Sequence, residues 1–200
     1  CIDDHGFSTI KTEGKIADLE KKLLHQTCDG HIGIGHTRWA THGSPSVCNA
    51  HPHLSHNEVS IVHNGIIENE QEIRDQLIGH NYVFQSETDS ETIAHLCHYL
   101  LHQSNDILTT LSTLRDMLKG SYAIGIITSQ HPDTIYAIKH QSPLIIGLTD
   151  QGNFIASDLS AIAELTETFI FMEDGDIAHI CLDSYHIWDK NNQPATRQPR

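Results

Sequence analysis

Apolar residues recur every three or four positions in several stretches of the chain, and this spacing predicts amphipathic helices. The stretches are 15–25, 88–101 and 107–118, with a weaker fourth at 70–78. Thr88 and Glu91 have the spacing of a capping box at the start of the second helix. Gly120 follows the third helix where a C-terminal glycine belongs, and Gly79 ends the fourth.

Short apolar runs bounded by turn residues predict strands. The predicted strands are 31–35, 58–63, 122–129, 134–140, 144–148, 153–156, 169–173, 177–182 and 186–189. From residue 121 onward nearly the whole chain is predicted strand, and turns such as 130–133 and 174–175 indicate hairpins. Because helices and hairpins are segregated and strict β-α-β alternation is absent, we expect an α+β fold with antiparallel sheets rather than a Rossmann-type sheet.

Composition narrows the class of protein. Two hundred residues suit one domain with a buried core. Twelve basic against 26 acidic residues give a formal charge of −14, which argues against nucleic acid and anionic membranes as partners. No apolar run is long enough for a spanning helix, and the first residues do not form a signal peptide. Five cysteines without CxxC spacing favour reduced thiols in a cytoplasmic protein.

Three polar segments are candidate sites, and each also has a purely structural interpretation. Residues 35–53 place a cation, a Trp, hydroxyls and imidazoles in a loop after a predicted strand, although a polar surface loop would look the same. Asn64-Gly65 is first of all a turn signal, but a side-chain amide beside a backbone N–H can also form an oxyanion hole. The acids and hydroxyls at 86–91 suit a helix start, so a functional Asp89 would need a cationic partner.

The histidines raise the alternative of a metal-binding module. His51, His53, His56 and His63 are close in sequence, and His-x-His on a strand points both rings to one face. No Cys or carboxylate completes a zinc spacing, and Pro52 disturbs strand geometry, so we expect neither metal nor cofactor. The glycines at 30–35 are not in the order of a dinucleotide-binding loop, and no helix follows them.

Taken in order along the chain, these segments resemble one family. The matching strings are 36–43 (HTRWATHG), 49–53 (NAHPH), 63–69 (HNGIIEN), 86–89 (SETD), 131–133 (HPD), 142–147 (SPLIIG), 154–158 (FIASD) and 173–177 (EDGDI). They resemble the glutaminase domain of the glucosamine-6-phosphate synthases, which are class II amidotransferases. Purine-pathway amidotransferases and asparagine synthetases share the fold but are not expected to carry these strings.

The resemblance implies an N-terminal-nucleophile hydrolase fold, a four-layer sandwich with two antiparallel sheets between helix layers. It also implies hydrolysis of L-glutamine to glutamate and ammonia through a cysteinyl thioester. The attacking thiolate would belong to the first residue of the family's domain, whose α-amino group serves as base because its free pKa of ~7.7–8.0 suits proton transfer near neutral pH. Ammonia would then convert fructose 6-phosphate into glucosamine 6-phosphate.

The same resemblance assigns roles to the polar segments. The Asn64 side chain and the Gly65 N–H would stabilise the oxyanion. Arg38 would hold the α-carboxylate of glutamine, and Asp89 would hold its α-ammonium. Trp39, Thr41, His42 and Gly43 would line the loop that closes over glutamine. His51 would lie nearby, in a structural or a catalytic role.

The resemblance also predicts how the domain is bounded. Residues 1–190 would form the glutaminase domain. The polar segment 191–200 would begin a linker to a sugar-phosphate isomerase domain of the same polypeptide, through which a homodimer is expected.

The family's domain starts Cys-Gly-Ile, followed by an apolar strand and a helix. Cys1 is instead followed by Ile2, an acidic turn at 3–6 and a return strand at 7–12 that leads to Gly14-Lys15. We therefore expect the family's first strand and helix to be missing and Cys1 to be an ordinary strand residue. Two alternatives stay open: a fragment that at most binds glutamine, and a His-rich metal-binding module.

Overall fold

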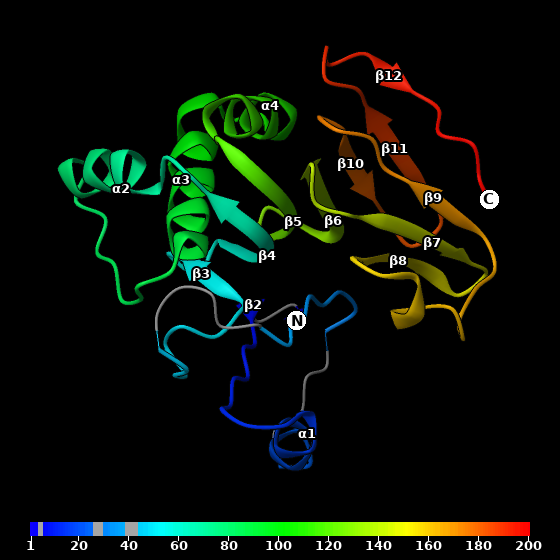
Figure 1. Ribbon diagram of the computed structural model, residues 1–200, viewed down its shortest axis with the longest axis horizontal. Coiled ribbons are helices and arrows are strands. Elements are labelled where there is room, and N and C mark those ends of the chain that lie inside the picture. Colours follow the sequence, from blue (N-terminus) through cyan, green and yellow to red (C-terminus); the bar gives the residue numbers. More distant parts are fainter. Residues whose placement is uncertain (4–5, 26–29, 39–43) are drawn as a thin grey trace.

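The computed structural model describes residues 1–3, 6–25, 30–38 and 44–200, and in this part of the chain two antiparallel sheets pack face to face (Figure 1). The larger sheet has the strand order β12-β11-β10-β6-β5-β4-β3 and the smaller one β8-β7-β9. A third pairing joins β1 to β2. All these pairs are antiparallel, which confirms the α+β class.

The elements follow the predicted order along the chain. The helices are α1 (Ile16–Leu23), α2 (Glu70–Gly79), α3 (Asp89–Ser104), α4 (Ile107–Met117) and the 3₁₀ helix η1 (Leu159–Ala161). The strands of the larger sheet are β3 (His53–Ser55), β4 (Val59–Ile67), β5 (Gly120–Thr128), β6 (His131–His140), β10 (Ile177–Ile180), β11 (Tyr185–Trp188) and β12 (Pro194–Ala195). The remaining strands are β1 (Ile2–Asp3), β2 (Gly6–Phe7), β7 (Ile145–Thr149), β8 (Gly152–Ala156) and β9 (Phe169–Phe171).

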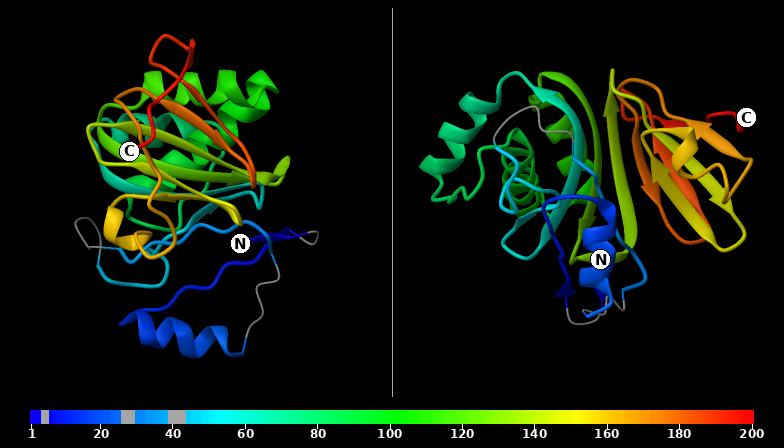
Figure 2. Two further views of the ribbon diagram at one scale, coloured as in Figure 1. Left: turned by 90° about the vertical axis from the view of Figure 1, so that its right-hand side faces the viewer. Right: turned by 60° about the horizontal axis from the view of Figure 1, so that its bottom comes forward.

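Side chains along the strands of the larger sheet point alternately to its two faces, and each face is covered by its own hydrophobic core. On one face Ile124, Ile126 and Ile138 pack with α2, α3 and α4. On the other face Ala123 and Ala137 pack with the smaller sheet. Successive residues of a strand point to opposite faces, so both faces of β5 and β6 are buried. Figure 2 shows the resulting order of layers, from helices through the larger sheet to the smaller sheet.

The outer face of the smaller sheet is covered by the segment around η1. Ile162, at the end of η1, packs with Ile145 of β7 and Ala156 of β8. In the described residues this cover is a short 3₁₀ helix with its flanking turns, where the sequence predicts a second helix layer. α1 lies apart from these layers (Figure 2) and has no buried residue, so its apolar face is not part of the core.

Several local predictions are wrong, each for a tertiary reason. Residues 31–35 form no strand and make only an isolated bridge, between Ile2 and Ile32. Asn64-Gly65 is not a turn, because both residues pair with β5 inside β4. Gly120 does not end α4 but begins β5, opposite Ile67. The predicted return strand at 7–12 is limited to Gly6–Phe7.

The capping box predicted at the start of α3 does not form. Thr88 is the N-cap residue, but its side chain makes no cap hydrogen bond. Its hydroxyl instead contacts the Ser86 hydroxyl at 2.9 Å and His53 Nε2 at 3.1 Å. Glu91 accepts hydrogen bonds from the backbone N–H groups of Gln85 and Ser86.

The C-terminal segment packs on the larger sheet. β12 pairs with β11, and the Arg197 guanidinium donates two hydrogen bonds to Asp176, at 2.9 and 2.6 Å. Asp176 is fully buried, so this ion pair fixes the segment strongly. The boundary predicted at residue 190 stays a prediction. No helix in the described part of the chain is long and apolar enough to cross a membrane.

Candidate active site

The candidate site is built on β4, whose alternation sends neighbouring side chains to different layers. Ile61 and Ile67 pack in the helix-side core, and His63 on the same face contacts Ser90 of α3 at 3.0 Å. Val62 and Asn64 point to the opposite face and line a cavity. Asn64 and His63 are therefore adjacent in sequence but belong to different surroundings.

The cavity has a volume of about 1060 Å³. Its walls come from the larger sheet, the smaller sheet and the extended segment 31–37. Residues that represent these walls are His36, Asn64, Ala123, Ile135, Ile155 and Cys181. The larger part of this lining is apolar, and the polar residues in it include His36, Asn64, Asp133, Asn153 and Asp183. A largely apolar cavity with polar groups placed in it is typical of a small-molecule site.

His36 fixes the orientation of the Asn64 side chain. The backbone N–H of Arg38 donates to His36 Nδ1 at 2.8 Å, so Nδ1 is the acceptor and Nε2 carries the proton. Nε2 then donates to Asn64 Oδ1 at 2.6 Å. The Asn64 oxygen is thereby occupied, and its NH₂ group is left as the donor. Burial lowers the pKa of His36, which keeps this neutral tautomer in place.

A row of three histidines, of which His63 is buried and His36 and His51 are half-buried, connects Asn64 to the start of α3. The His36 ring lies 4.2 Å from the His51 ring. His51 Nε2 and His63 Nδ1 each lie 3.0 Å from the Ser90 hydroxyl. Burial lowers the pKa of His51 far below its usual range and that of His63 to about 4, so both rings are neutral at pH 7.

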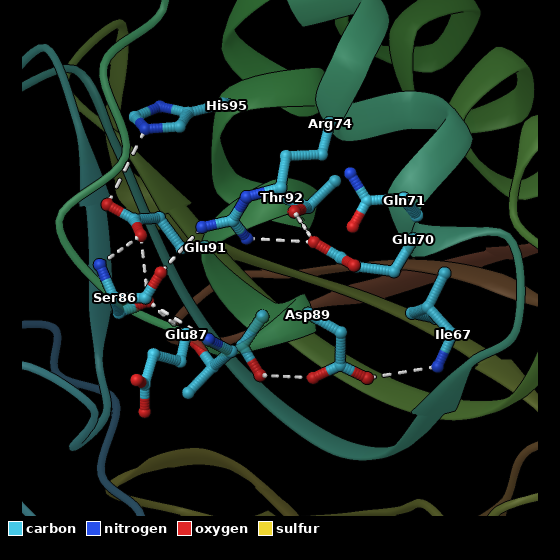
Figure 3. A network of polar contacts seen from close by, with 12 residues as sticks. Ile67, Glu70, Gln71, Arg74, Ser86, Glu87, Asp89, Glu91, Thr92 and His95 are labelled. Atoms are coloured by element: carbon cyan, nitrogen blue, oxygen red, sulfur yellow. Dashed lines mark hydrogen bonds and ion pairs between the residues drawn. The ribbon is translucent and has the colours of Figure 1, made fainter. Parts of the chain in front are cut away.

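Asp89 is the first residue of α3 and is held against the end of β4 (Figure 3). Its Oδ2 accepts a hydrogen bond from the Ile67 N–H at 3.0 Å, and its Oδ1 lies 3.8 Å from His63 Nδ1. The helix N-terminus favours a carboxylate here. Asp89 therefore lies beside residues 63–67 of β4, the part that contains Asn64 and Gly65.

A second carboxylate fixes the loop before α3. Glu91 accepts hydrogen bonds from the backbone N–H and the hydroxyl of Ser86, at 2.6 and 2.7 Å. Arg74 donates to the Ser86 carbonyl at 2.6 Å and to Glu70 at 2.8 Å (Figure 3). Burial raises the pKa of Glu91, but hydrogen bonds from His95, Gln85 and Ser86 outweigh it and bring the pKa to about 2. This network holds the loop that leads directly into Asp89 at the start of α3.

Gly65 can only be glycine in this backbone. Its φ is +129°, a conformation that L-residues with a side chain rarely adopt. A Cβ atom at this position would lie 2.0 Å from the Ser121 carbonyl oxygen. The close approach of β4 and β5 therefore excludes any side chain beside Asn64.

Of the remaining predicted site residues the structure describes only Arg38, which lies at the edge of this arrangement. Arg38 follows His36 with φ of +37°, and its Nη1 donates to the Ser44 carbonyl at 3.3 Å. Arg38, Gly65 and Asp89 do not line the cavity. Trp39, Thr41, His42 and Gly43 lie outside the described residues. Cys1 does not line the cavity either, and its amino group donates to the Ser8 carbonyl at 3.0 Å.

Comparison with known proteins identifies the family. A family model of the glutamine amidotransferase domain matches residues 36–164, which is more than half of the chain. The chain belongs to the glutamine amidotransferase family. It is 46% identical over 198 residues to a glutamine–fructose-6-phosphate aminotransferase (isomerizing) of Pseudomonas aeruginosa, and 44% identical over 185 residues to one of Pseudomonas putida. These alignments cover 98% and 92% of the amidotransferase chain but 32% and 30% of the relatives' length.

Solved structures confirm the fold. A glutamine phosphoribosylpyrophosphate amidotransferase from B. subtilis matches with a TM-score of 0.64 and 23% identity, over 80% of this chain and 35% of that one. An allosteric regulatory enzyme of purine biosynthesis matches with a TM-score of 0.60 and 24% identity, over 82% of this chain and 34% of that one. The fold is the N-terminal-nucleophile amidotransferase type that the sequence predicts.

Two positioning groups of this amidotransferase site have no recognisable role in the sequence. His36 is part of a matching string, but nothing in its spacing indicates that it holds Asn64. Ser90 has the sequence position of a helix-start residue, although its hydroxyl joins His51 to His63. The available signal was the density of imidazoles in a segment with no metal-ligand spacing, which suggests hydrogen-bonded histidines in a buried network.

The buried histidines predict that stability falls with acidity. Burial, with the positive charge of Lys11 adding to it, lowers the pKa of His53 to about 3, whereas an unfolded histidine has a pKa near ~6.5. Between these values the unfolded chain binds a proton that the folded protein does not, so the free energy of unfolding decreases as pH falls. Each such histidine contributes a slope of up to about 1.4 kcal/mol per pH unit.

Urea unfolding of wild type and His53→Gln at pH 7, 6 and 5 measures this slope. The free energy of unfolding of His53→Gln should fall less steeply with decreasing pH than that of wild type. The difference in slope should be up to about 1.4 kcal/mol per pH unit. His80→Gln, which changes an exposed histidine outside the network, is the matched control and should follow wild type. Equal slopes in wild type and His53→Gln would contradict the assignment.

Proposed function

We propose that this domain hydrolyses L-glutamine to glutamate and ammonia through a cysteinyl thioester. The observation that carries the proposal is the Asn64 side chain, fixed by His36 on the wall of the cavity with its NH₂ group left to donate. A fixed donor in a largely apolar cavity suits a reaction in which negative charge develops on a carbonyl oxygen. The relatives named as glutamine–fructose-6-phosphate aminotransferases support glutamine as the substrate.

In the proposed first step a thiolate attacks the side-chain amide carbon of glutamine. The electron pair of the C=O bond moves to the oxygen, and Asn64 Nδ2–H and the Gly65 N–H donate hydrogen bonds to that oxyanion. Its collapse breaks the C–N bond, and the leaving nitrogen takes a proton and departs as ammonia. Water then attacks the thioester and gives a proton to the α-amino group of the nucleophilic cysteine, and the thiolate leaves to give glutamate.

The two ends of the substrate would be recognised by opposite charges. Arg38 binds the α-carboxylate through its planar guanidinium, and Asp89 binds the α-ammonium. The network behind Asp89 supports this role, because binding to a pre-positioned carboxylate costs little reorganisation. Arg38 is linked to the same part of the site by the hydrogen bond of its backbone N–H to His36.

The proposal leaves Cys1 outside the catalytic machinery. Its amino group donates a hydrogen bond to the Ser8 carbonyl, and Cys1 itself does not line the cavity, although it lies next to Gly33, which does. The attacking thiolate would correspond to the cysteine that opens the domain in the resembling family.

The ammonia would be consumed on a sugar phosphate. The relatives' name supports fructose 6-phosphate as the acceptor and glucosamine 6-phosphate as the product. This chain spans about 30% of their length, so the aminated sugar, a sugar-phosphate isomerase domain of the same polypeptide and a homodimer formed through it belong to this proposal.

Replacing Asn64 tests the oxyanion hole. In a glutaminase-active form of the protein, Asn64→Ala should lower kcat about 10²–10³-fold with little change in KM, because one donor to the transition state is lost. Release of glutamate measured by a coupled assay gives both constants. Asn191→Ala, an exposed asparagine of the C-terminal segment, is the control and should keep wild-type kcat. An unchanged kcat in Asn64→Ala would remove Asn64 from the mechanism.

Replacing Arg38 and Asp89 tests recognition of the amino acid. Asp89→Asn keeps an oxygen that can accept from the Ile67 N–H but removes the charge, so the helix start is preserved. Both Asp89→Asn and Arg38→Ala should raise the glutamine KM by at least about 30-fold, since loss of one charged partner costs on the order of 2–5 kcal/mol.

Asp106→Asn is the matched control for Asp89→Asn. Asp106 is the N-cap of α4 and accepts a hydrogen bond from the Thr109 N–H at 2.8 Å, so it too is a carboxylate at a helix start that accepts a backbone hydrogen bond, without the proposed binding role. It should leave KM unchanged. Wild-type KM in both Arg38→Ala and Asp89→Asn would show that these charges do not bind glutamine.

Alkylation tests the exclusion of Cys1. When the chain is incubated with an electrophilic glutamine analogue, Cys1 should react no faster than the exposed Cys48, and glutamine should not protect it. Peptide mapping by mass spectrometry measures both rates. Stoichiometric, glutamine-protected labelling of Cys1 would make it the nucleophile.

A further inference from the structure

A cluster of three ligand-type side chains lies on the helix side of the larger sheet. His98 and His102 are one turn apart on α3, and Glu58 immediately precedes β4. Glu58 Oε2 lies 2.8 Å from His102 Nε2 and 3.7 Å from His98 Nε2. One ligand atom from each residue lies within 4.8 Å of the other two.

This spacing fits a tetrahedral metal ion. Histidines at i and i+4 lie on one face of a helix, the arrangement by which helical His pairs bind zinc. Metal–ligand bonds of ~2.0–2.2 Å at tetrahedral angles place neighbouring ligand atoms about 3.4 Å apart. The two separations from Glu58, 2.8 and 3.7 Å, lie on either side of this distance, and the two histidine nitrogens are within 4.8 Å of each other.

His98 gives the independent observation that points to a ligand. Its ring is buried, and its Nε2 has no hydrogen-bond partner although it faces Glu58. Its other nitrogen, Nδ1, lies 2.7 Å from the Tyr82 hydroxyl, and the ring stacks on His56 at 4.3 Å. When Nδ1–H donates to the Tyr82 oxygen, Nε2 presents a lone pair, the form that binds a metal.

The backbone of Glu58 is held in place by hydrogen bonds of both its N–H and its carbonyl group. The Glu58 N–H donates to the Ser55 carbonyl, and the Glu58 carbonyl accepts from the Ser129 N–H, both at 2.9 Å. His102 is half exposed, which leaves the cluster open to an ion and to a water ligand. Two imidazoles and one carboxylate favour zinc, copper, nickel or cobalt over calcium or magnesium, which prefer oxygen ligands.

We propose that Glu58, His98 and His102 form a binding site for a divalent transition-metal ion of the zinc class, with the fourth position open to water. The ion joins the C-terminal half of α3 to the start of β4. None of the three residues lines the cavity, so the site is independent of the proposed glutamine chemistry. It also differs from the set His51, His53, His56 and His63 considered from the sequence.

Binding to the folded protein but not to the unfolded chain stabilises the fold. Metal-free protein titrated with ZnCl₂ by calorimetry should bind one ion at this cluster, and saturating zinc should raise the Tm. With CoCl₂ the protein should develop the intense visible d–d absorption of a tetrahedral cobalt site. Glu58→Gln and His102→Ala should each weaken the affinity at least about tenfold and remove most of the zinc-dependent Tm shift.

Two further variants separate a metal site from an ordinary ion pair. Tyr82→Phe keeps Glu58, His98 and His102 but removes the hydroxyl on His98 Nδ1, and it should weaken zinc binding about 10-fold. His80→Ala, which removes an exposed histidine outside the cluster, should bind zinc as wild type does.

The proposal is overturned if wild type shows no zinc-dependent Tm shift. It is also overturned if zinc affinity is the same in wild type, Glu58→Gln and His102→Ala, because the ion would then bind elsewhere. If Glu58→Gln and His102→Ala lower the Tm and zinc changes the Tm of neither wild type nor variants, the three residues form an ion pair and not a metal site. Glutaminase activity does not enter any of these readouts.

Discussion

The site depends on the register of β4 against β5. The nine residues of β4 pair antiparallel with β5, with His63 opposite Ile124 and Asn64 opposite Ala123. Because side chains alternate along a strand, a shift of one residue would exchange the two faces. The Asn64 side chain would then turn from the cavity side of the sheet to the helix-side core. The position of the proposed oxyanion donor is therefore fixed by the same register that buries Ile61 and Ile67.

This register is enforced by packing on the helix side of the sheet and by a close backbone contact between β4 and β5. On the helix side, moving Ile61 or Ile67 out of the core would expose apolar surface to water. This exposure costs about 25 cal/mol of folding free energy for each Å². At the end of the ladder, Gly65 allows β4 to approach Ser121 so closely that no other residue fits there. Packing and backbone sterics thus support one pairing, and a strand with only one buried face would not be held as firmly.

The sequence predicted the helices and most strands because their patterns are long and local. It failed where tertiary pairing overrides a local signal. Asn64-Gly65 has strong turn propensity, yet pairing with β5 keeps it extended. Segment 31–35 is apolar but contains Gly33 and Gly35, which weaken a strand, and it bridges only through Ile32.

The site was predictable only in part. The resemblance named Asn64, Gly65, Arg38 and Asp89, and their catalytic roles stay predictions. The contact of His36 with Asn64 joins residues 28 positions apart, and no local pattern reports such a contact.

The abundance of histidine has a consequence for charge at the start of α3. A protonated imidazole 3.8 Å from Asp89 would neutralise that carboxylate and compete with any cationic ligand. Burial instead lowers the pKa of His63 to about 4, although Asp89 itself acts to raise it. The ring therefore contacts Ser90 without adding a positive charge. A neutral His63 keeps the negative charge of Asp89 available for the ammonium group of the proposed substrate.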